Sequence, residues 1–575
     1  MIPRWPVIAA CWVAIAVGGA APRAATLEAD ALLDGSRVVE VAITLPAEDW
    51  EVLRDQSRGP AGLFGAAPPT PFSWYRGSVT VDGVEIADVG VRKKGFFGSL
   101  DSERPSLIVD FGRFSKQKPV DGLGRLTLNN NKQDTALVGQ FLAFAMFRAA
   151  GVPAPRAGFA AVTVNGERLG VYTSVEAVKK PFLERVFGSS AGALYEGTVA
   201  DVVPESLDKL ELETDADARE LLDTLSGVLA AEGPVDLAAI ERLVAVDEFL
   251  GFWAVEALIG MWDGYSSNQN NFFVYVAPTD GRLHFIPWGP DSSFTRPPGF
   301  MGGGNRRAPP AVYAQGAVAN RLYFAPGIPG RYRARLEQLL AEVWKEDALL
   351  EQVDRLETLL APHLGPTQAN AGRSMEAVRG FITRRRGELE KAFEEWPAEA
   401  PETYRRPITT RKVGTLQGRF AVTQRADATD EVAPGDVNVS LVLDGDEIPL
   451  EDVTVTAYPL PLGGQRAMSR GDTSAAPIAV TVSARRPESG TFTATFMLDR
   501  RLVRDTTEPV NATGMLTEGA GFFGKGPVRM LGGDVTLDER GVDPGSRIAG
   551  SFEFSVDQSQ GGFGNSAANR RPDEP

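Results

Sequence analysis

Alternating apolar and polar positions mark the front of the chain as a sheet. The segments VVEVAITL (38–45) and VTVDGVEIADVGVR (79–92) have the pattern of strands, and the second contains an Asp-Gly turn. In FAAVTVNGERLGVYTSVEAV (159–178), two strand patterns flank Asn165-Gly166, the signature of a tight hairpin turn. These segments predict that the first part of the chain forms a sheet.

Apolar spacings of three and four residues then replace the alternation. The segment 135–150 follows Asp134, which is suited to cap a helix, and it stops at Gly151-Val152-Pro153. Longer helical patterns cover roughly 236–262, 331–360 and 374–395. A strand-rich front followed by a helical rear predicts two lobes of one α+β unit, which we place at residues 26–395.

The last third of the chain returns to strands after a proline-rich connection. Residues 396–410 contain few large apolar side chains and are predicted to be a linker, so truncation near Thr403 should leave the front part soluble. Strand patterns separated by turn residues recur over 411–558 and favour an all-β, sandwich-like domain. The Gly-, Asn- and Ser-rich end, 559–575, is predicted to be disordered.

The first 25 residues have the layout of a cleavable secretory signal, with Arg4, an apolar stretch and then small residues. No later stretch reaches the roughly 18 uninterrupted apolar residues of a membrane span. We therefore expect a secreted, periplasmic or cell-surface protein without a stable membrane span. The only cysteine, Cys11, lies in this segment, so the processed chain would have no disulfide and no thiolate metal site.

Composition narrows the chemistry that the protein can perform. The 575-residue chain has a formal net charge of −16, which disfavours nucleic-acid binding because that binding needs a basic surface. A basic or neutral partner fits this charge better. Neither His284 nor His363 has a second histidine near it, so zinc sites and Ser-His-Asp hydrolysis lack support. Catalysis would depend on carboxylates, amides, Lys and Arg, which suit hard cations and phosphate.

Oxygen-bearing side chains crowd the segment MWDGYSSNQNNFFVY (261–275), between an apolar helical run and an apolar strand. Beyond it, FFVYV and RLHFI flank APTDG, which predicts a β-hairpin centred near Thr279. In that register Asn268 lies opposite Asp291 of WGPDSSF, and Asp263 joins them at the open end of the hairpin. The three side chains would form an oxygen-rich site suited to Mg²⁺.

The spacing of Asp263 and Asn268 is also that of the catalytic loop of protein kinases. In that loop the Asp accepts the proton of the substrate hydroxyl, and the Asn holds a metal ion. A structural interpretation is also open, because Asp and Asn are common in turns. Asp263 and the following amides could simply cap a helix and start a strand.

Several segments together resemble the spore-coat protein H (CotH) kinase family. They occur in the family's order between about residues 38 and 393, and they are VGVRKKG, LTLNNNKQD, FRAAGVPAPRAGFAAVTVNGERLGVYTSVEAV, MWDGYSSNQNNFFVY and FIPWGPDSSF. The resemblance implies a two-lobed, atypical protein-kinase-like fold that uses ATP with Mg²⁺ or Mn²⁺. It also implies a secreted or spore-associated kinase.

The resemblance assigns roles to individual residues by their position. Asp263 corresponds to the catalytic base, and Asn268 and Asp291 correspond to metal ligands. Lys94, at the end of a predicted strand, corresponds to a lysine that pairs with the nucleotide phosphates, and Arg92 lies beside it. A lysine at a strand end is otherwise usually a solvated edge residue.

Two assignments stay open at this point. Lys93 lies in the same RKKG run and is a rival for the role of Lys94. The segment from Glu176 to Val178 follows a strand and precedes a predicted helix. It could form the hinge that lines an adenine pocket, or it could only connect the lobes.

The chain departs from the family pattern at two positions. The family's W-D-x-D is here Trp288, Gly289, Pro290 and Asp291, so one of two acids is missing and metal binding is in question. Restoring the acid with Gly289→Asp should raise metal affinity, provided the backbone admits a carboxylate there. Gln140 stands where a lysine-pairing glutamate is expected, so Lys94 needs another partner.

Three functions remain after these observations. The first is an exported kinase that transfers the γ-phosphate of ATP to Ser or Thr of a secreted or surface protein, such as a basic one. The second is a non-catalytic surface or matrix binding protein with a degenerate kinase domain, which fits the scarcity of ATP outside most cells. The third is a carboxylate-pair hydrolase, which no serine elbow or metal-histidine motif supports.

Overall fold

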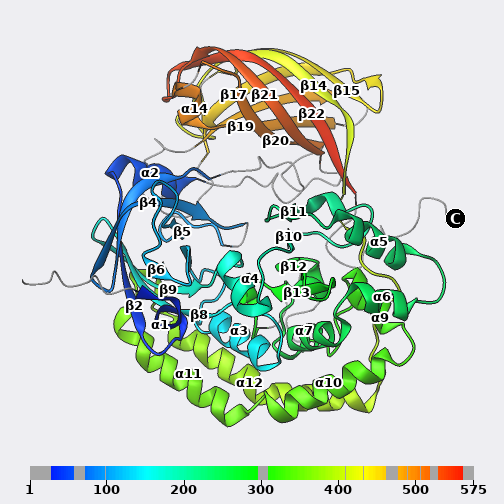
Figure 1. Cartoon of the computed structure of the whole chain (residues 1–575). Helices are drawn as coiled ribbons and strands as arrows, with labels where there is room; N and C mark the ends of the chain where they lie inside the picture. Colours follow the sequence, from blue (N-terminus) through cyan, green and yellow to red (C-terminus); the bar gives the residue numbers. More distant parts are fainter. Residues whose placement is uncertain are drawn as a thin grey trace, which may run out of the picture.

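The computed structural model describes residues 27–56, 72–96, 99–295, 309–407, 409–431, 433–460, 477–487, 490–505, 507–518 and 529–560. The predicted signal segment 1–25 and residues 561–575 of the predicted tail lie outside these ranges. Figure 1 shows a strand-rich part on the left, a helix-rich part on the right and along the bottom, and a large sheet at the top. The protein therefore has an α+β fold followed by an all-β part.

The strand-rich part is a closed barrel with the strand order β2-β3-β4-β5-β7-β9-β8. Its strands are β2 Val38–Thr44, β3 Tyr75–Val81, β4 Val84–Lys94, β5 Ser106–Asp110, β7 Arg125–Asn129, β8 Ala157–Val164 and β9 Glu167–Val175. The predicted turns at Asp82-Gly83 and Asn165-Gly166 have positive φ at both residues, as hairpin turns of this kind require. The parallel pairing of β2 with β8 closes the barrel around an apolar interior.

Short elements lie beside the barrel, and they are β1 Leu27–Glu28, α1 Ala29–Leu33, α2 Ala47–Asp55 and β6 Val120–Asp121. A four-stranded sheet with the order β11-β10-β12-β13 lies within the helix-rich part. Its strands are β10 Ala193–Gly197, β11 Leu210–Leu212, β12 Phe272–Val276 and β13 Leu283–Pro287. The helices around it are α3 Gly139–Ala149, α4 Lys180–Phe187, α5 Arg219–Ala230, α6 Leu237–Leu243, α7 Val246–Leu258, α8 Tyr265–Asn268, α9 Ala317–Tyr323, α10 Ile328–Glu342, α11 Glu346–Leu360 and α12 Ala371–Glu394.

Helix α7 is the centre of the helix-rich part, because every residue from Phe249 to Leu258 is buried. The structure divides the predicted helix 236–262 into α6 and α7. The division falls at Val244 and Ala245, where the chain leaves the helix to bridge to Leu283 of β13. The predicted helix 331–360 is likewise two helices, α10 and α11.

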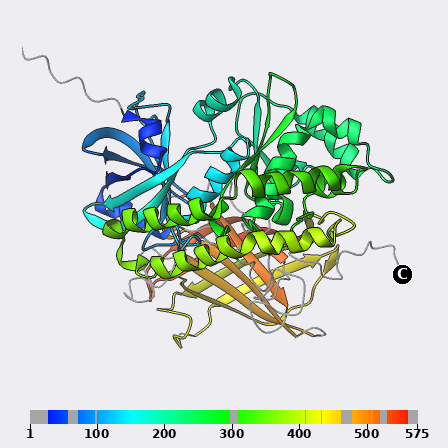
Figure 2. The ribbon, with the colours of Figure 1, turned by 90° about the horizontal axis from the view of Figure 1, so that it is seen from below.

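Helices α11 and α12 connect the barrel to the helix-rich part. Figure 1 and Figure 2 show them running beneath both parts, in yellow-green. After α11, the Gln368 side chain bonds both the N–H (2.9 Å) and the carbonyl (2.8 Å) of Val171 in the barrel. On α12, the buried Arg385 donates to the carbonyls of Ala257 (2.7 Å) and Leu258 (3.1 Å) at the end of α7. The two helices therefore brace one part against the other.

The C-terminal part is one nine-stranded sheet with the order β16-β15-β14-β22-β21-β20-β19-β18-β17. Its elements are β14 Thr409–Thr423, β15 Asp436–Leu443, β16 Asp446–Glu447, β17 Glu451–Pro459, β18 Ile478–Arg486, β19 Gly490–Leu498, α14 Arg500–Asp505, β20 Val510–Glu518, β21 Arg529–Arg540 and β22 Arg547–Gln560. The all-β prediction is confirmed, but the sheet is not a sandwich of two sheets. From β17 to β22 each strand pairs with the next one in the chain, so no strand crosses to a second sheet.

The sheet curls until its two sides meet. Gly435, just before β15, bridges to Val455 in β17 with a hydrogen bond of 2.8 Å. A single apolar core fills the inside. Strand β22 continues to Gln560, so the predicted tail starts later than residue 559.

The predicted linker is packed rather than free, and we call residues 396–407 the strap. Trp396 stacks on Tyr332 of α10 with ring centroids 6.2 Å apart. The Tyr323 hydroxyl donates to the carbonyl of Ala398 (2.6 Å), and Asn320 donates to the carbonyl of Pro401 (2.8 Å). The strap has few apolar side chains, as the sequence shows, but those it has are packed against the core of the helix-rich part. Within the described ranges, no helix combines the length and the apolar character needed to cross a membrane.

Candidate active site

A buried carboxylate holds the loop that carries most of the predicted site residues. Glu256, on α7, is fully buried and accepts hydrogen bonds from the backbone N–H groups of Tyr265 (2.8 Å) and Ser266 (2.9 Å). A Cβ on Gly264 would lie 2.1 Å from the Glu256 carboxylate, so this close approach requires glycine. Burial raises the pKa of Glu256 to about 7. The sequence patterns did not single out Glu256, which lies within an apolar helical run.

Asp263 begins this loop and is surrounded by amides. Its Oδ1 accepts hydrogen bonds from the side chains of Asn268 (2.5 Å) and Asn270 (3.2 Å), and its Oδ2 accepts one from Asn271 (3.0 Å). Burial raises the pKa of Asp263, and the three amides oppose this because they stabilise the ionised carboxylate. A carboxylate offers about four acceptor positions, so one position remains at Oδ2. The N-cap of α8 is Gly264, without a side-chain hydrogen bond, so Asp263 does not cap that helix.

Strands β12 and β13 confirm the predicted hairpin. Val276 lies opposite Leu283, and Phe272 lies opposite Pro287, so the turn is centred next to Thr279. In this register the chain beyond β13 runs back past the Asp263 loop. The N–H of Trp288 continues the pairing by donating to the carbonyl of Asn271 (3.0 Å).

Asp291 follows the hairpin in a single short turn, η3 Pro290–Ser292. Burial raises the pKa of Asp291 to about 7, and the negative charges of Asp263 and Asp134 add to this effect. Asp263 lies at the same end of the hairpin, because its carboxylate accepts a hydrogen bond from Asn271, whose carbonyl pairs with Trp288. The structure thus brings Asp263, Asn268 and Asp291 to the open end of the hairpin.

Lys94, at the end of β4 in the barrel, extends to the open end of the hairpin. Its Nζ donates to Oδ1 of Asn129 (2.6 Å) and lies 5.6 Å from the centroid of the Trp288 ring. Burial lowers the pKa of Lys94 to about 8, while the negative charge of Asp291 opposes the decrease. Lys94 therefore lies at the seam between the barrel and the hairpin end that carries Trp288 and Asp291.

An uncharged chain of amides supports Lys94 where a glutamate was expected. Asn129 donates to Oε1 of Gln140 (2.7 Å), and Gln140 donates to Oδ1 of Asn131 (3.0 Å). Gln140 lies at the start of α3, where its N–H donates to the Asp134 carboxylate (3.0 Å). Asp134 thus supports the start of the helix, although α3 begins at Gly139 rather than at residue 135. The partner of Lys94 comes from the LTLNNNKQD segment.

The neighbours of Lys94 have other partners. Lys93 points to the opposite side of β4, is 1% exposed, and donates to the carbonyl of Arg54 (2.5 Å). Arg92 lies on the same side as Lys94 but stacks over the ring of Trp74, 4.8 Å from its centroid. The alternation of side chains along β4 therefore excludes Lys93 from the site that Lys94 faces.

Glu176 and Val178 lie between the barrel and α4, where a connection between lobes was predicted. Glu176 is 1% exposed and pairs with Arg156 (2.7 Å) and Arg185 (2.6 Å). Burial would raise the pKa of Glu176, but the two guanidinium groups hold it below its ordinary value. Val178 packs beside Phe182 in a small apolar cluster. Both side chains have structural partners, and the contact of Glu176 and Val178 with an adenine stays a prediction.

Arg405 enters the site from the strap, although no sequence pattern marked it. It is 5% exposed, and its guanidinium donates to Oδ1 of Asn268 (2.6 Å) and to Oε1 of Gln269 (2.9 Å). Its backbone N–H donates to the carbonyl of Gln315 (2.9 Å). The role of Arg405 could not be predicted from the sequence. The strap has many prolines and few large apolar side chains, which is also typical of a free linker.

A second buried carboxylate that sequence reasoning missed, Asp201, fixes the other side of the loop. Asp201 accepts hydrogen bonds from the Tyr265 hydroxyl (2.8 Å), the Gln269 side chain (2.6 Å) and the N–H of Ala317 (2.7 Å). Burial raises the pKa of Asp201, and these donors oppose the change. The Asp263 loop is therefore held by Glu256, Asp201 and Arg405 together.

The side chains of the site match a pair of divalent metal ions poorly. The side-chain oxygen of Asn268 faces Arg405, Asp263 is ringed by amides, and Gly289 has no side chain. Among the residues that the structure describes, no group of three or more His, Cys, Asp and Glu side chains could hold a metal ion. Mg²⁺ is commonly held by one or two carboxylates together with water and substrate phosphates. Asp291 could supply such a carboxylate for one ion, but the two-metal arrangement of kinases does not fit these residues.

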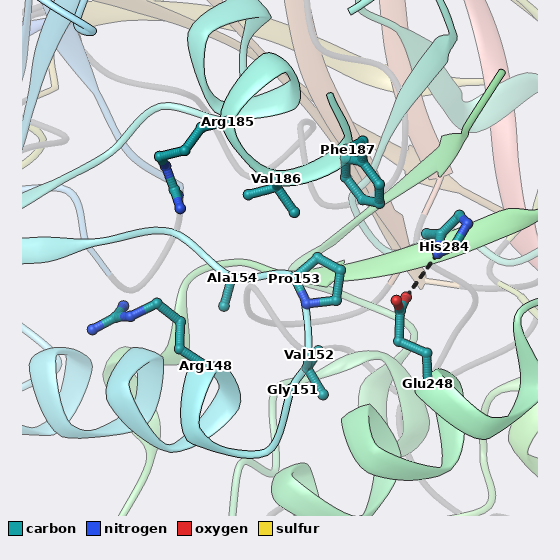
Figure 3. A pocket seen from close by; sticks show the side chains of 10 residues that line it. All are labelled: Arg148, Gly151, Val152, Pro153, Ala154, Arg185, Val186, Phe187, Glu248 and His284. Atoms are coloured by element: carbon teal, nitrogen blue, oxygen red, sulfur yellow. Dashed lines mark hydrogen bonds and ion pairs between the residues drawn. The ribbon is translucent and has the colours of Figure 1, made fainter. Parts of the chain in front are cut away.

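A pocket of about 350 Å³ lies apart from these residues, between α3, α4, α7 and β13 (Figure 3). Figure 3 shows His284 of β13 facing Glu248 of α7, 3.0 Å apart, with Arg148 and Arg185 on the opposite side. The strand position predicted for His284 is confirmed. The pocket touches the site only indirectly, because Arg185 is a partner of Glu176.

Comparisons with known proteins show which family the chain resembles. The profile of the family described as CotH kinase protein matches residues 91–388, about half of the chain. Inner spore coat protein H of Bacillus subtilis (strain 168) is 25% identical over 212 residues, which cover 34% of this chain and 58% of that protein. The inner spore coat protein H-like protein of the same organism is 26% identical over 201 residues, which cover 34% of this chain and 59% of that protein. The chain thus matches less than two thirds of either relative.

Among solved structures, the Helicobacter pylori proinflammatory kinase CtkA overlaps 52% of this chain and 97% of that chain. The identity is 9% and the TM-score is 0.22. The family match itself spans Lys94, Asp263, Asn268 and Asp291 and ends before Arg405. By this match, the chain belongs to the CotH kinase protein family.

Proposed function

We propose that the protein is an exported phosphotransferase that transfers the γ-phosphate of ATP to a Ser or Thr hydroxyl of a secreted or surface protein. The observation that supports this proposal best is the position of Lys94, which Asn129 holds beside the Trp288 ring at the end of the hairpin that carries Asp263 and Asp291. A cation and two carboxylates in a partly buried place suit the transfer of a charged phosphoryl group. Family membership favours the same chemistry.

In this proposal Lys94 acts on the phosphates of ATP, and Asp263 acts on the hydroxyl of the acceptor. Bound ATP would supply the phosphoryl group, and Lys94 would offset the negative charge of the phosphates from a position fixed by Asn129. Asp263 would accept the proton of the acceptor hydroxyl at its remaining Oδ2 position. Because burial raises the pKa of Asp263, its carboxylate is a stronger base than an ordinary aspartate.

The net charge and the predicted signal segment restrict the class of protein that the acceptor could be. The net charge of −16 favours a basic or neutral protein over a nucleic acid. The predicted secretory signal in residues 1–25 favours an enzyme and an acceptor that both lie outside the cytoplasm. A basic, serine-rich protein is therefore the acceptor class to test first.

A non-catalytic binding protein is the second candidate, and two observations favour it. Gly289 replaces one acid of the family pattern, and Arg405 occupies the side-chain oxygen of Asn268. Both reduce the capacity of the site for metal ions, on which phosphoryl transfer in kinases depends. In this alternative the kinase-like part would be a scaffold for the C-terminal sheet.

Labelled ATP decides between the two candidates. The full chain would be incubated with ATP labelled at the γ-phosphate and with Mg²⁺ or Mn²⁺, with and without a basic, serine-rich acceptor protein. We expect transfer to the acceptor, and we expect Asp263→Asn to abolish transfer while nucleotide binding persists, since the base acts on the acceptor. Transfer that survives in Asp263→Asn would contradict the assigned base. If the folded wild type binds no nucleotide under either metal, the second candidate is correct.

A further inference from the structure

The guanidinium group of Arg405 donates to the side-chain oxygen of Asn268, which the family resemblance assigns as a ligand of a metal ion. Arg405 uses all three of its nitrogens there, because Nη1 donates to Oδ1 of Asn268 (2.6 Å), Nη2 to the Asn268 carbonyl and Nε to Gln269 (2.9 Å). The residue is 5% exposed, so these bonds lie largely out of contact with water. A built, buried contact of this kind differs from a surface arginine that happens to lie near an amide.

The orientation of the Asn268 amide follows from its two charged neighbours. Its Nδ2 donates to the Asp263 carboxylate (2.5 Å), and its Oδ1 accepts from Arg405. A reversed amide would place an N–H₂ group against the guanidinium and an oxygen against the carboxylate, and both contacts would be repulsive. The oxygen of Asn268 is therefore directed at Arg405.

A divalent ion on the same oxygen would compete directly with the guanidinium. Metal–oxygen distances for Mg²⁺ are about 2.1 Å, so the ion and the guanidinium would lie within a few ångströms of one another. Two cations at that separation repel strongly in a site that water only partly screens. Asn268 can therefore hold Arg405 or a metal ion, but not both.

The surrounding charges fit a site that already contains its cation. The positive charge of Arg405 interacts with the carboxylates of Asp263 and Asp201. Burial lowers the pKa of Arg405 to about 10, so it remains charged at neutral pH. At the opposite side Gly289 brings no carboxylate, so the negative charge that a second metal ion would need is missing.

We propose that Arg405 is the resident cation of this site, where its guanidinium takes the place of a divalent metal ion at Asn268. Any metal ion that enters with a nucleotide would then be a single one, on the side of Asp291 and Lys94. The nucleotide part of this inference rests on the function proposed above, whereas the exclusion of metal from Asn268 does not. Arg405 acts through Asn268, so it is a positioning residue rather than a catalytic one.

Titration of the full chain with MnCl₂ alone tests the exclusion, with bound and free Mn²⁺ distinguished by electron paramagnetic resonance. We expect weak binding to the wild type and about tenfold or more tighter binding to Arg405→Gln, which keeps an amide donor but removes the charge. Arg405→Met should bind as tightly as Arg405→Gln, and Arg405→Lys, which keeps the charge, should remain as weak as the wild type. The matched control is Arg406→Gln, because Arg406 is the exposed neighbour and its charge should not matter.

Several results would overturn the proposal. They are tight Mn²⁺ binding by the wild type, equal affinities of folded Arg405→Gln and wild type, and equal gains in Arg405→Lys and Arg405→Gln. If circular dichroism shows that the neutral variants are unfolded, the number of Mn²⁺ ions that the wild type binds together with a non-hydrolysable ATP analogue tests the proposal. One bound Mn²⁺ per chain supports the proposal, and two contradict it. Absence of ATP binding in the presence of Mg²⁺ or Mn²⁺ would instead contradict the proposed function and leave the result for MnCl₂ alone unaffected.

Discussion

At the scale of single residues, the two adjacent lysines of β4 should behave differently. Lys94 contacts Asn129 and the Trp288 ring at the candidate phosphate site, whereas Lys93 donates to the carbonyl of Arg54 on the other side of the strand. We expect Lys94→Met to weaken nucleotide binding by about tenfold or more, because a buried charge-assisted contact is lost. Lys93→Met should leave nucleotide binding unchanged and alter only stability. Isothermal titration with an ATP analogue measures the first effect, and equal losses in both variants would contradict the assignment of Lys94.

The raised pKa of Asp291 makes the free energy of unfolding depend on pH. Its ordinary pKa is 3.8 and its pKa in the folded chain is about 7, mainly because of burial. Between about pH 4 and 7 the folded chain therefore keeps a proton that the unfolded chain releases, so the free energy of unfolding falls as the pH rises. Asp291→Asn cannot ionise and should lose less stability from pH 5 to pH 8 than the wild type does. The difference should be up to a few kcal/mol, since one pKa unit is about 1.4 kcal/mol.

Urea unfolding of both proteins at pH 5 and pH 8 measures this difference. The pKa values of Asp134 and Glu256 are also raised, but these groups are present in both proteins and largely cancel. Identical pH dependence in the two proteins would show that the Asp291 carboxyl titrates normally.

At the scale of the element, the hairpin end that carries Gly289 does not admit the missing acid. Gly289 has φ +49, and a Cβ there would lie 2.7 Å from Oδ1 of Asn271, whose amide supports Asp263. The sequence predicted that Gly289→Asp would raise metal affinity if the backbone allowed it. We now expect the variant to lose about 1–3 kcal/mol of stability without binding Mn²⁺ more tightly.

Gly281→Asp is a matched control, because Gly281 has φ +69 in the same hairpin and open space around its Cβ position. It should lose less stability than Gly289→Asp in urea unfolding, and the difference reports the collision with Asn271. Tighter Mn²⁺ binding in Gly289→Asp would show that the loop can rearrange to accept a carboxylate.

Features that depend on residues close together in the sequence could be predicted from it. Features that depend on contacts between distant residues could not. The hairpin register and the Asn165-Gly166 turn follow from spacing within one or two strands. The alternation along β4 could also have separated Lys93 from Lys94, which the sequence analysis left as rivals. Asn129 could have been found as a strand-end amide in LTLNNNKQD, next to the predicted sheet. Arg405 could not, because its contact with Asn268 spans 137 residues and depends on how the strap packs. The curled single sheet was missed for a similar reason, since strand spacing does not reveal whether neighbours in the chain stay in one sheet.

At the scale of the whole molecule, the helices α11 and α12 and the strap hold the front part together. The helical pair braces the barrel against α7 through Gln368 and Arg385. The strap closes over the Asp263 loop through Arg405. The sequence placed a domain boundary near Thr403, which would cut the strap before Arg405. The contacts of Arg405 instead favour a boundary at the end of the strap, just before β14.

Truncation on either side of Arg405 should therefore give different proteins. A chain that ends at Pro407 keeps every strap contact, and we expect it to unfold cooperatively without the C-terminal sheet. A chain that ends at Glu402 removes the donors to Asn268 and to the carbonyl of Gln315. Each buried acceptor left without a donor costs about 1–3 kcal/mol, so this shorter chain should unfold at clearly lower urea concentration. Arg406→Ala in the longer chain controls for loss of an exposed strap charge. Equal urea midpoints for the two truncated chains would mean that the strap, including Arg405, contributes nothing to the fold of the site.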